Sequence, residues 1–194
     1  MSFIARFFIF WIFVATAFSS EWTTLDDCRL IPNEYNDGDS FHVEHDGEEF
    51  IFRLYFVDCP EAENSFPERV EEQAQYFGIT PEKSIEVGRY AKAATEQILS
   101  DGFKVVTRWQ KALGRSKLPR FYAFVLVEGQ DPKTEDLNAI LVSNGLARLH
   151  GVKASAPDFP SAVELESQYE NLEEEAKVDG YGAWGKKDEI RRMQ

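Results

Sequence analysis

The sequence predicts an α+β fold of five short strands and several helices. The order of the periodic segments indicates this class, because three strands, a helix, two strands and then helices is an α+β arrangement. The composition supports it, since 43% hydrophobic and 14% aromatic residues are enough to build a sizeable core. The length of 194 residues suits one domain with short additions.

The first 19 residues are expected to be a signal peptide, and residues 20–194 one folded domain. An apolar run, FFIFWIFVATAF, follows Arg6 and precedes Ser19 and Ser20, which is the layout of a cleavable secretory leader. The run is shorter than the roughly 20 residues of a spanning helix, and an uncleaved membrane anchor is the alternative. Cleavage would give a secreted or periplasmic protein without stable membrane association.

Five segments are expected to be strands, because they are rich in β-branched and aromatic residues and are bounded by turn residues. They are residues 28–31, 40–43, 50–57, 103–109 and 121–127. His45-Asp-Gly47 predicts a hairpin turn between the second and the third. The third ends before Pro60, since proline cannot donate to a strand ladder. Five short strands are the number in an OB barrel, and the sequence therefore predicts that fold.

A long helix is expected over residues 81–99, where the apolar residues fall mostly on one stripe. Thr80 supplies an N-cap for it, and Pro81 occupies the first helical position, where proline is favoured. Further helices are expected over residues 67–76, 137–144 and 160–176.

The formal net charge of −13 argues against a nucleic-acid partner, since such a chain repels polyphosphates at long range. One stretch answers this objection locally, because residues 103–127 contain no Asp or Glu. The stretch carries Lys104, Arg108, Lys111, Arg115, Lys117 and Arg120. It is either a solvated loop or a positive surface that faces a phosphate.

Asp39 and Asp58 flank the predicted hairpin, which brings its two ends together. Two carboxylates placed there can reach one cation, and such hard oxygen ligands suit calcium or magnesium rather than zinc. Asp39 also has a simpler interpretation, because Asp-Gly-Asp is common in turns.

Arg53 is the only charged residue in residues 50–57, and an arginine inside a barrel strand is costly without a partner. That partner is either an internal carboxylate or a phosphate bound by two hydrogen bonds. Glu61 lies shortly after Asp58, where a carboxylate beside a metal is a candidate base for activating water.

Several segments together resemble the staphylococcal nuclease family. They are Asp37-Gly-Asp-Ser40, Phe52-Arg-Leu54, Val57-Asp-Cys-Pro-Glu61, Arg120-Phe-Tyr-Ala-Phe-Val125, Leu137-Asn-Ala-Ile-Leu-Val-Ser-Asn-Gly-Leu-Ala147 and Tyr181-Gly-Ala-Trp184. The resemblance covers roughly residues 28–185, and the combination is specific although each segment alone is weak.

The resemblance implies a five-stranded OB barrel with about three main helices packed on it. It also implies a calcium-dependent nuclease, which cuts single-stranded DNA or RNA and leaves 3′-phosphate ends. It implies calcium held by Asp39, Asp58 and the backbone carbonyl of Cys59. It also implies that Glu61 acts through water on the nucleophile while Arg53 and Arg120 bind the phosphate. These roles agree with those inferred from the residues themselves. We expect the enzyme to be a monomer.

The chain departs from the family pattern at several positions. Cys59 replaces a threonine, a change that a backbone ligand tolerates. Lys117 precedes leucine where the family has tyrosine, and Lys153 replaces one of two pocket tyrosines. We expect both lysines to contact substrate, with a weak or rebuilt base subsite. Arg115 competes with Arg120 as the second arginine, and the spacing to the strand favours Arg120. An acidic insertion before the long helix could shield the cleft.

Cys28 and Cys59 are expected to form a disulfide, because paired thiols are the default in an oxidising compartment. Two buried free thiols are the alternative. Two other functions also stay open at this point. One is a catalytically inactive OB module that binds protein or oligonucleotide, and the other is a phosphodiesterase for small nucleotides, which the acidic surface allows.

Overall fold

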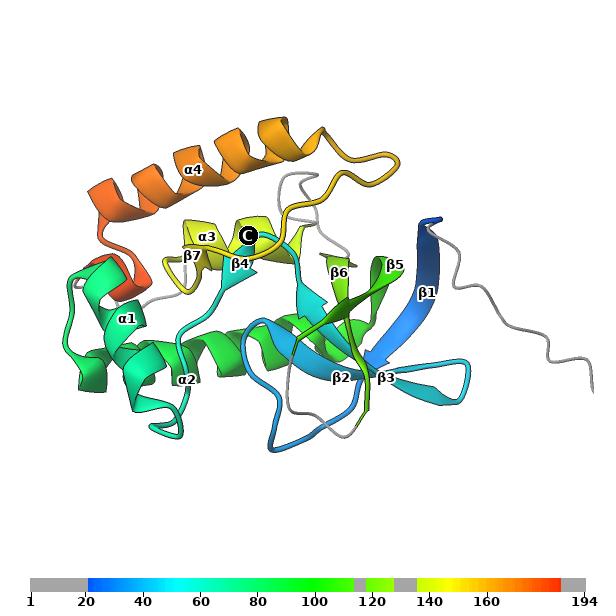
Figure 1. The fold of residues 1–194 in the computed structure, drawn as a ribbon, viewed down its shortest axis with the longest axis horizontal. Coiled ribbons are helices and arrows are strands. Elements are labelled where there is room, and N and C mark those ends of the chain that lie inside the picture. The colour runs from blue at the N-terminus through cyan, green and yellow to red at the C-terminus, as the bar shows by residue number, and fades with distance from the viewer. Residues whose placement is uncertain (1–20, 114–117, 128–135, 186–194) are drawn as a thin grey trace, which may run out of the picture.

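The computed structural model describes residues 21–113, 118–127 and 136–185, and within them five strands close a barrel that four α-helices accompany (Figure 1). The predicted α+β class and the five-stranded barrel are confirmed. The expected signal peptide, residues 1–19, lies outside the described residues, as do Arg115 and Lys117. No helix in the described part of the chain is long and apolar enough to cross a membrane.

The barrel follows the order β1, β2, β3, β6, β5, and β5 closes it against β1. Its strands are β1 Thr23–Leu30, β2 Ser40–His45, β3 Glu48–Leu54, β5 Phe103–Ala112 and β6 Arg120–Val127. Strands β3 and β6 are parallel, and the other neighbours are antiparallel. The register pairs Arg53 with Ser40 on one side and with Tyr122 on the other. The chain segments just before β2 and at the start of β6 therefore lie beside Arg53.

The hairpin between β2 and β3 turns where the sequence predicts. Asp46 has φ 52° and Gly47 has φ 80°. Two consecutive left-handed residues are characteristic of the type I′ turn, whose twist matches that of the flanking strands.

The third strand is not continuous over residues 50–57 as predicted, because β3 ends at Leu54. Phe56 has φ 63°, and this left-handed conformation turns the chain out of the barrel. The chain resumes as β4 Val57–Asp58, which pairs with β7 Arg148–Leu149 in a separate two-stranded ladder. The apolar pattern could not reveal the break, since the side chains on both sides of it are buried. Its consequence is that Asp58 lies opposite Arg148 instead of inside the barrel.

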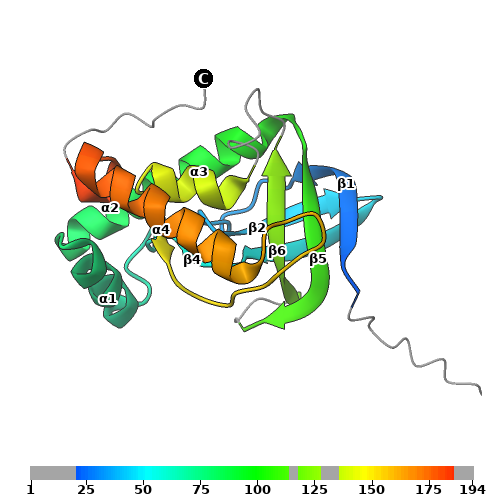
Figure 2. The same ribbon diagram turned by 90° about the horizontal axis from the view of Figure 1, so that it is seen from above.

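The helices gather mainly to one side of the barrel (Figures 1 and 2). They are α1 Pro67–Phe77, α2 Pro81–Ile98, α3 Leu137–Ser143 and α4 Ala162–Asp179, with short 3₁₀ turns η1 Leu99–Asp101 and η3 Gly182–Trp184. The predicted cap of α2 is present, because the Thr80 hydroxyl accepts a hydrogen bond of 3.3 Å from the Lys83 amide. Helix α4 attaches through its buried Tyr169, whose ring meets Phe56 edge-on at 5.5 Å.

Candidate active site

Helix α2 supports the loop that carries Asp39. The Thr95 hydroxyl donates a 2.8 Å hydrogen bond to the carbonyl of Gly38. A side-chain carbon added at Gly38 would lie 2.7 Å from the Cys59 sulfur and 2.8 Å from the Ala91 methyl group. Contacts this short are not tolerated, so only glycine lets the Asp39 loop fit between α2 and Cys59.

The same helix supports the loop that carries Glu61. A side-chain carbon at Gly88 would lie 2.4 Å from the Glu61 carbonyl oxygen and 2.5 Å from that of Pro60. Gly88 lies seven residues before Thr95 on the same face of α2, since positions three, four and seven apart share a face. One helix face therefore positions both loops of the site.

Asp39 is fixed by backbone hydrogen bonds on both sides. The Asp37 carboxylate accepts from the amides of Asp39 at 3.1 Å and Ser40 at 2.7 Å, which makes a local side-chain turn. Burial and the nearby Asp39 carboxylate raise the pKa of Asp37 well above its ordinary value. Asp39 Oδ2 in turn accepts a 2.8 Å hydrogen bond from the Cys59 amide. The two loops are thus tied together at Asp39 and Cys59.

Arg53 bridges the two aspartates that the sequence singled out. Its Nη2 atom lies 3.0 Å from Asp39 Oδ2 and 2.6 Å from Asp58 Oδ1. Burial would lower the pKa of Arg53, but Asp39 and Asp58 raise it above its ordinary value. Arg53 therefore has the internal carboxylate partners that the sequence analysis considered for it.

Asp58 is fully buried and accepts four side-chain hydrogen bonds or ion pairs. Arg53 and Arg69 contact its Oδ1 atom. Gln73 Nε2 and Arg148 Nε each lie 2.9 Å from its Oδ2 atom. Burial by itself would raise the pKa of Asp58, but Arg53, Arg69, Gln73 and Arg148 lower it to about 2. The carboxylate is therefore ionised at neutral pH, with each oxygen carrying two donors.

Glu61 is held by helix α1. Its carboxylate accepts from Arg69 Nε, and its backbone amide donates to Gln73 Oε1 at 2.9 Å. The Gln73 amide also donates to the Cys59 carbonyl at 3.0 Å. Arg69 and Gln73 are four residues apart on α1 and so face the site together.

Arg69, Gln73 and Arg148 were not predicted from the sequence. A signal for Gln73 was available, since the buried stripe of α1 contains Val70, Gln73, Ala74 and Phe77. A polar residue within an apolar stripe is costly without a buried partner, which makes it a candidate for a site. Arg148 offered no comparable signal, because Asp58 is brought to it by the β4–β7 ladder and Glu72 by helix α1.

Arg120 lies at the edge of this cluster. Its Nη1 atom donates to the Ser40 hydroxyl at 3.1 Å, and its Nη2 atom donates to the Leu113 carbonyl. Its Nε atom is buried and has no acceptor within the residues described. Burial and the positive charge of Arg53 lower the pKa of Arg120. Two arginines from neighbouring strands thus approach each other, a repulsive arrangement that an anion between them would relieve.

Lys153, one of the two lysines expected to contact substrate, does not join the cluster. Lys153 forms an ion pair with Glu166 of α4. In the basic stretch, Arg108 contacts Gln110 and stacks 5.4 Å over Trp22, on another part of the barrel. Of the basic residues in 103–127, Arg120 lies at the site, and Arg115 and Lys117 lie outside the described residues.

The predicted disulfide is wrong, because Cys28 and Cys59 are both free and buried. Cys28 lies within β1, pairs with Phe103 of β5 and directs its thiol to the Leu25 carbonyl at 3.5 Å. Cys59 instead packs against Gly38 and Ala91 under α2. Burial raises the pKa of both thiols, that of Cys28 to about 12. Cys28 lies within a barrel strand, whereas Cys59 follows β4, which has left the barrel for the separate ladder with β7.

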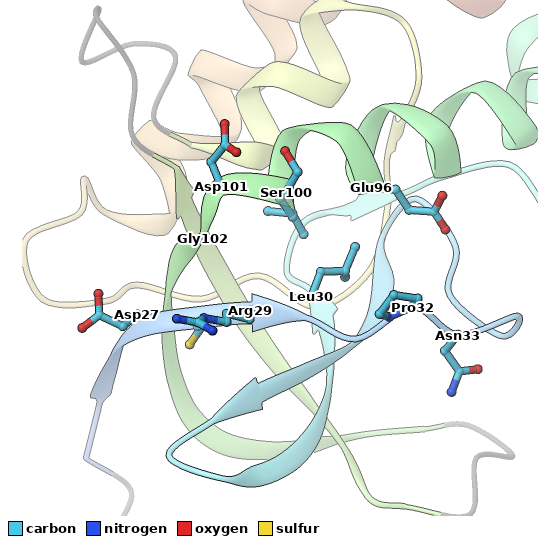
Figure 3. A pocket seen from close by; sticks show the side chains of 11 residues that line it. Asp27, Arg29, Leu30, Pro32, Asn33, Glu96, Ser100, Asp101 and Gly102 are labelled. Carbon is cyan, nitrogen blue, oxygen red and sulfur yellow. The ribbon is translucent and has the colours of Figure 1, made fainter.

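A cavity of about 880 Å³ lies elsewhere, between β1 and the C-terminal end of α2. Figure 3 shows Asp27, Arg29, Glu96 and Asp101 around it. It shares no residue with the cluster around Asp58.

Comparison with known proteins identifies the family. The sequence model of the family described as staphylococcal nuclease homologue matches residues 51–186, which is more than half of the chain. The chain belongs to the staphylococcal nuclease family. The matched range contains Arg53, Asp58, Cys59, Glu61 and Arg120, and Asp39 precedes it.

A curated relative supports no finer assignment. The uncharacterized protein MJ1439 of Methanocaldococcus jannaschii is 28% identical over 154 residues, covering 76% of this chain and 67% of the relative. Nuclease activity is thus suggested at the level of the family.

The resemblance to staphylococcal nuclease assigns oxygens of Asp39, Asp58 and the Cys59 carbonyl to calcium. These oxygens are of the type that calcium binds, but Asp58 can bind the ion only after it loses one of its present donors. Asp39 and Asp58 contact the same nitrogen atom of Arg53, so their carboxylates lie close enough together to share one cation. Carboxylate and carbonyl oxygens are the ligands that calcium prefers. However, a carboxylate offers about four lone-pair sites, and those of Asp58 are taken. One donor to Asp58 must withdraw before calcium can bind it.

Proposed function

We propose that this chain is a calcium-dependent nuclease that hydrolyses the phosphodiester bonds of DNA or RNA. The observation that carries the proposal is the convergence of Arg53, Glu61 and two aspartates at one end of the barrel, with Arg120 beside them. The family match supports the reaction class. The buried Nε atom of Arg120, without an acceptor among the described residues, supports an anionic ligand at this place.

Three side chains perform two tasks in the proposed reaction. Arg53 and Arg120 donate to the non-bridging oxygens of the phosphate and stabilise the negative charge that develops there. Glu61 accepts a proton from the attacking water. The oxygen of that water forms a bond to phosphorus while the bond to the 5′ oxygen breaks. The 5′ oxygen leaves with the electron pair and takes a proton from solvent to become a hydroxyl, and the other product has a 3′-phosphate end.

Calcium, when bound, would be held by Asp39, Asp58 and the Cys59 carbonyl, and would supply electrostatic stabilisation of the phosphate oxygens. The chain's own contribution is to keep these oxygens together. Gln73 does so by linking Asp58, the Cys59 carbonyl and the Glu61 amide.

We also propose that the enzyme acts outside the cytoplasm as a monomer. The motive is the basic, apolar and small-residue pattern of residues 1–19. N-terminal sequencing of the protein recovered from the medium or periplasm tests this proposal, and an intact N-terminus would contradict cleavage.

A plasmid-nicking and oligonucleotide assay with calcium or with EDTA tests the nuclease proposal. We expect cleavage with calcium, loss of cleavage with EDTA, and loss in a Glu61→Gln variant. Hydrolysis of small phosphodiesters without cleavage of polymers would favour the small-nucleotide alternative. Oligonucleotide binding without any hydrolysis would favour an inactive binding module.

A further inference from the structure

Helix α1 places a guanidinium group between the two carboxylates on which the proposed reaction depends. Arg69 contacts Asp58 Oδ1 through Nη2 and Glu61 through Nε. Asp58 and Glu61 raise the pKa of Arg69 although its burial would lower it. A single side chain thus neutralises a proposed calcium ligand and the proposed base at once.

Arg69 is also the donor to Asp58 that can leave most easily. Its side chain is 34% exposed, whereas those of Arg53 and Arg148 are 15% and 4% exposed. Gln73 is fully buried and holds three groups of the site. Withdrawal of Arg69 exposes no unsatisfied buried donor, because its guanidinium can turn into water.

The same contact affects Glu61. Arg69 Nε contacts Glu61 Oε1, so the guanidinium occupies an oxygen of the carboxylate that would accept a proton from water. Release of Arg69 would therefore free an oxygen of Asp58 for a metal and an oxygen of Glu61 for water.

We propose that Arg69 and calcium are alternative occupants of Asp58, so that α1 carries an internal cation which calcium displaces. The inference rests on the proposed calcium site. It makes Arg69 a positioning residue that sets the calcium affinity of the enzyme and holds Glu61 while the metal is absent.

Calorimetric titration of calcium into the metal-free protein tests this proposal without any assay of activity. We expect Arg69→Gln to tighten calcium binding about tenfold, since it removes both a competitor and a nearby like charge. Arg89→Gln is the matched control, because Arg89 is an exposed arginine whose guanidinium donates to the Ala62 carbonyl at 3.2 Å. This control is expected to change the affinity by less than about twofold, because Arg89 is exposed and salt screens its charge, and its guanidinium bonds to a backbone carbonyl instead of a carboxylate.

Equal calcium affinities for the two variants, when the native protein binds calcium, would overturn the role of Arg69 and leave the proposed calcium site standing. The absence of calcium binding in the native protein and in every variant would overturn both. Arg69→Lys covers the case in which the glutamine variant does not fold. Lysine keeps the charge but cannot donate to both carboxylates through a planar fork, so it should tighten binding by a smaller factor, and unchanged or weaker binding would contradict the proposal.

Discussion

At the scale of single residues, Asp58 explains why this site needs so many arginines. The carboxylate is buried and ionised, and an ionised group out of water is tolerated only when it is paired and hydrogen-bonded. Arg53 comes from the neighbouring strand, Arg69 from α1 and Arg148 from the β4–β7 ladder. Each of these arginines supplies positive charge to Asp58, which a bound metal ion could supply in its place.

Glu61→Gln is expected to lower turnover about 10²–10⁴-fold while the fold survives, since this is the usual contribution of a general base. Single-turnover cleavage of an oligonucleotide at saturating calcium measures the effect. Glu63→Gln removes the same charge from an exposed position in the same loop and should leave turnover unchanged. Near-normal cleavage by the Glu61 variant would remove the proposed mechanism.

Arg120→Ala is expected to lower kcat about 10²–10³-fold, as for the loss of one donor to a developing oxyanion. Arg115→Ala should leave kcat nearly unchanged, because the strand register puts Arg120 beside Ser40 and Arg53. Steady-state kinetics of the two variants make the comparison. The opposite result would mean that the second arginine is Arg115.

At the scale of elements, α2 is the support of the site, although none of its side chains belongs to the cluster. Its contacts to the Gly38 carbonyl and to the Pro60–Glu61 backbone hold two loops that are distant in sequence. A rigid helix under both loops limits their relative movement, which keeps the carboxylates at a fixed separation.

Gly88→Ala distinguishes this support from ordinary helix stability. Alanine favours a helix by about 1 kcal/mol over glycine, so an isolated helix would gain stability. We expect the protein instead to lose stability and activity together, because the new carbon lies 2.4 Å from the Glu61 carbonyl. Thermal unfolding and cleavage assays report the two losses, and Glu86→Ala at an exposed position of the same helix is the control. A variant as stable and active as the native protein would show that the helix and the loop are not in close contact.

The sequence predicts most of the elements but only part of the site. The hairpin at Asp46–Gly47 and the Thr80 cap are local features, and local residue preferences suffice for them. The break at Phe56 depends on the ladder with β7, which no local pattern contains. Arg53 and Glu61 stood out because charge in an apolar segment and carboxylates near one another are visible in the chain. Arg148 did not, because its partner lies 90 residues away.

At the scale of the whole molecule, the negative net charge of the chain and the arginines of the site have to be considered together. The formal net charge of −13 repels a nucleic acid at a distance. It also favours the approach of a divalent cation. A metal bound at the site and the arginines beside it then act at short range, where screening by salt is weak.

Calcium is expected to stabilise the folded protein, because a ligand that binds only the native state raises the free energy of unfolding. The increase is about 2.7 kcal/mol at one hundred times the dissociation constant. Thermal unfolding followed by circular dichroism, with calcium and with EDTA, measures it. Asp39→Asn keeps an acceptor for the Cys59 amide but loses a charged ligand, so its melting temperature should respond little to calcium. An equal response in the native protein and the variant would place the stabilising calcium elsewhere.

The β4–β7 ladder has a consequence for the cooperativity of folding. Asp58 and Arg148 are 90 residues apart and both are buried. A partly folded chain that kept Asp58 packed against Arg69 and Gln73 of α1 while residues 148–149 were still loose would lack Arg148, and breaking a buried ion pair costs several kcal/mol. Such a species is therefore disfavoured, and the barrel and the helical side should unfold in one transition. Tryptophan fluorescence and far-ultraviolet circular dichroism should consequently give the same denaturation midpoint.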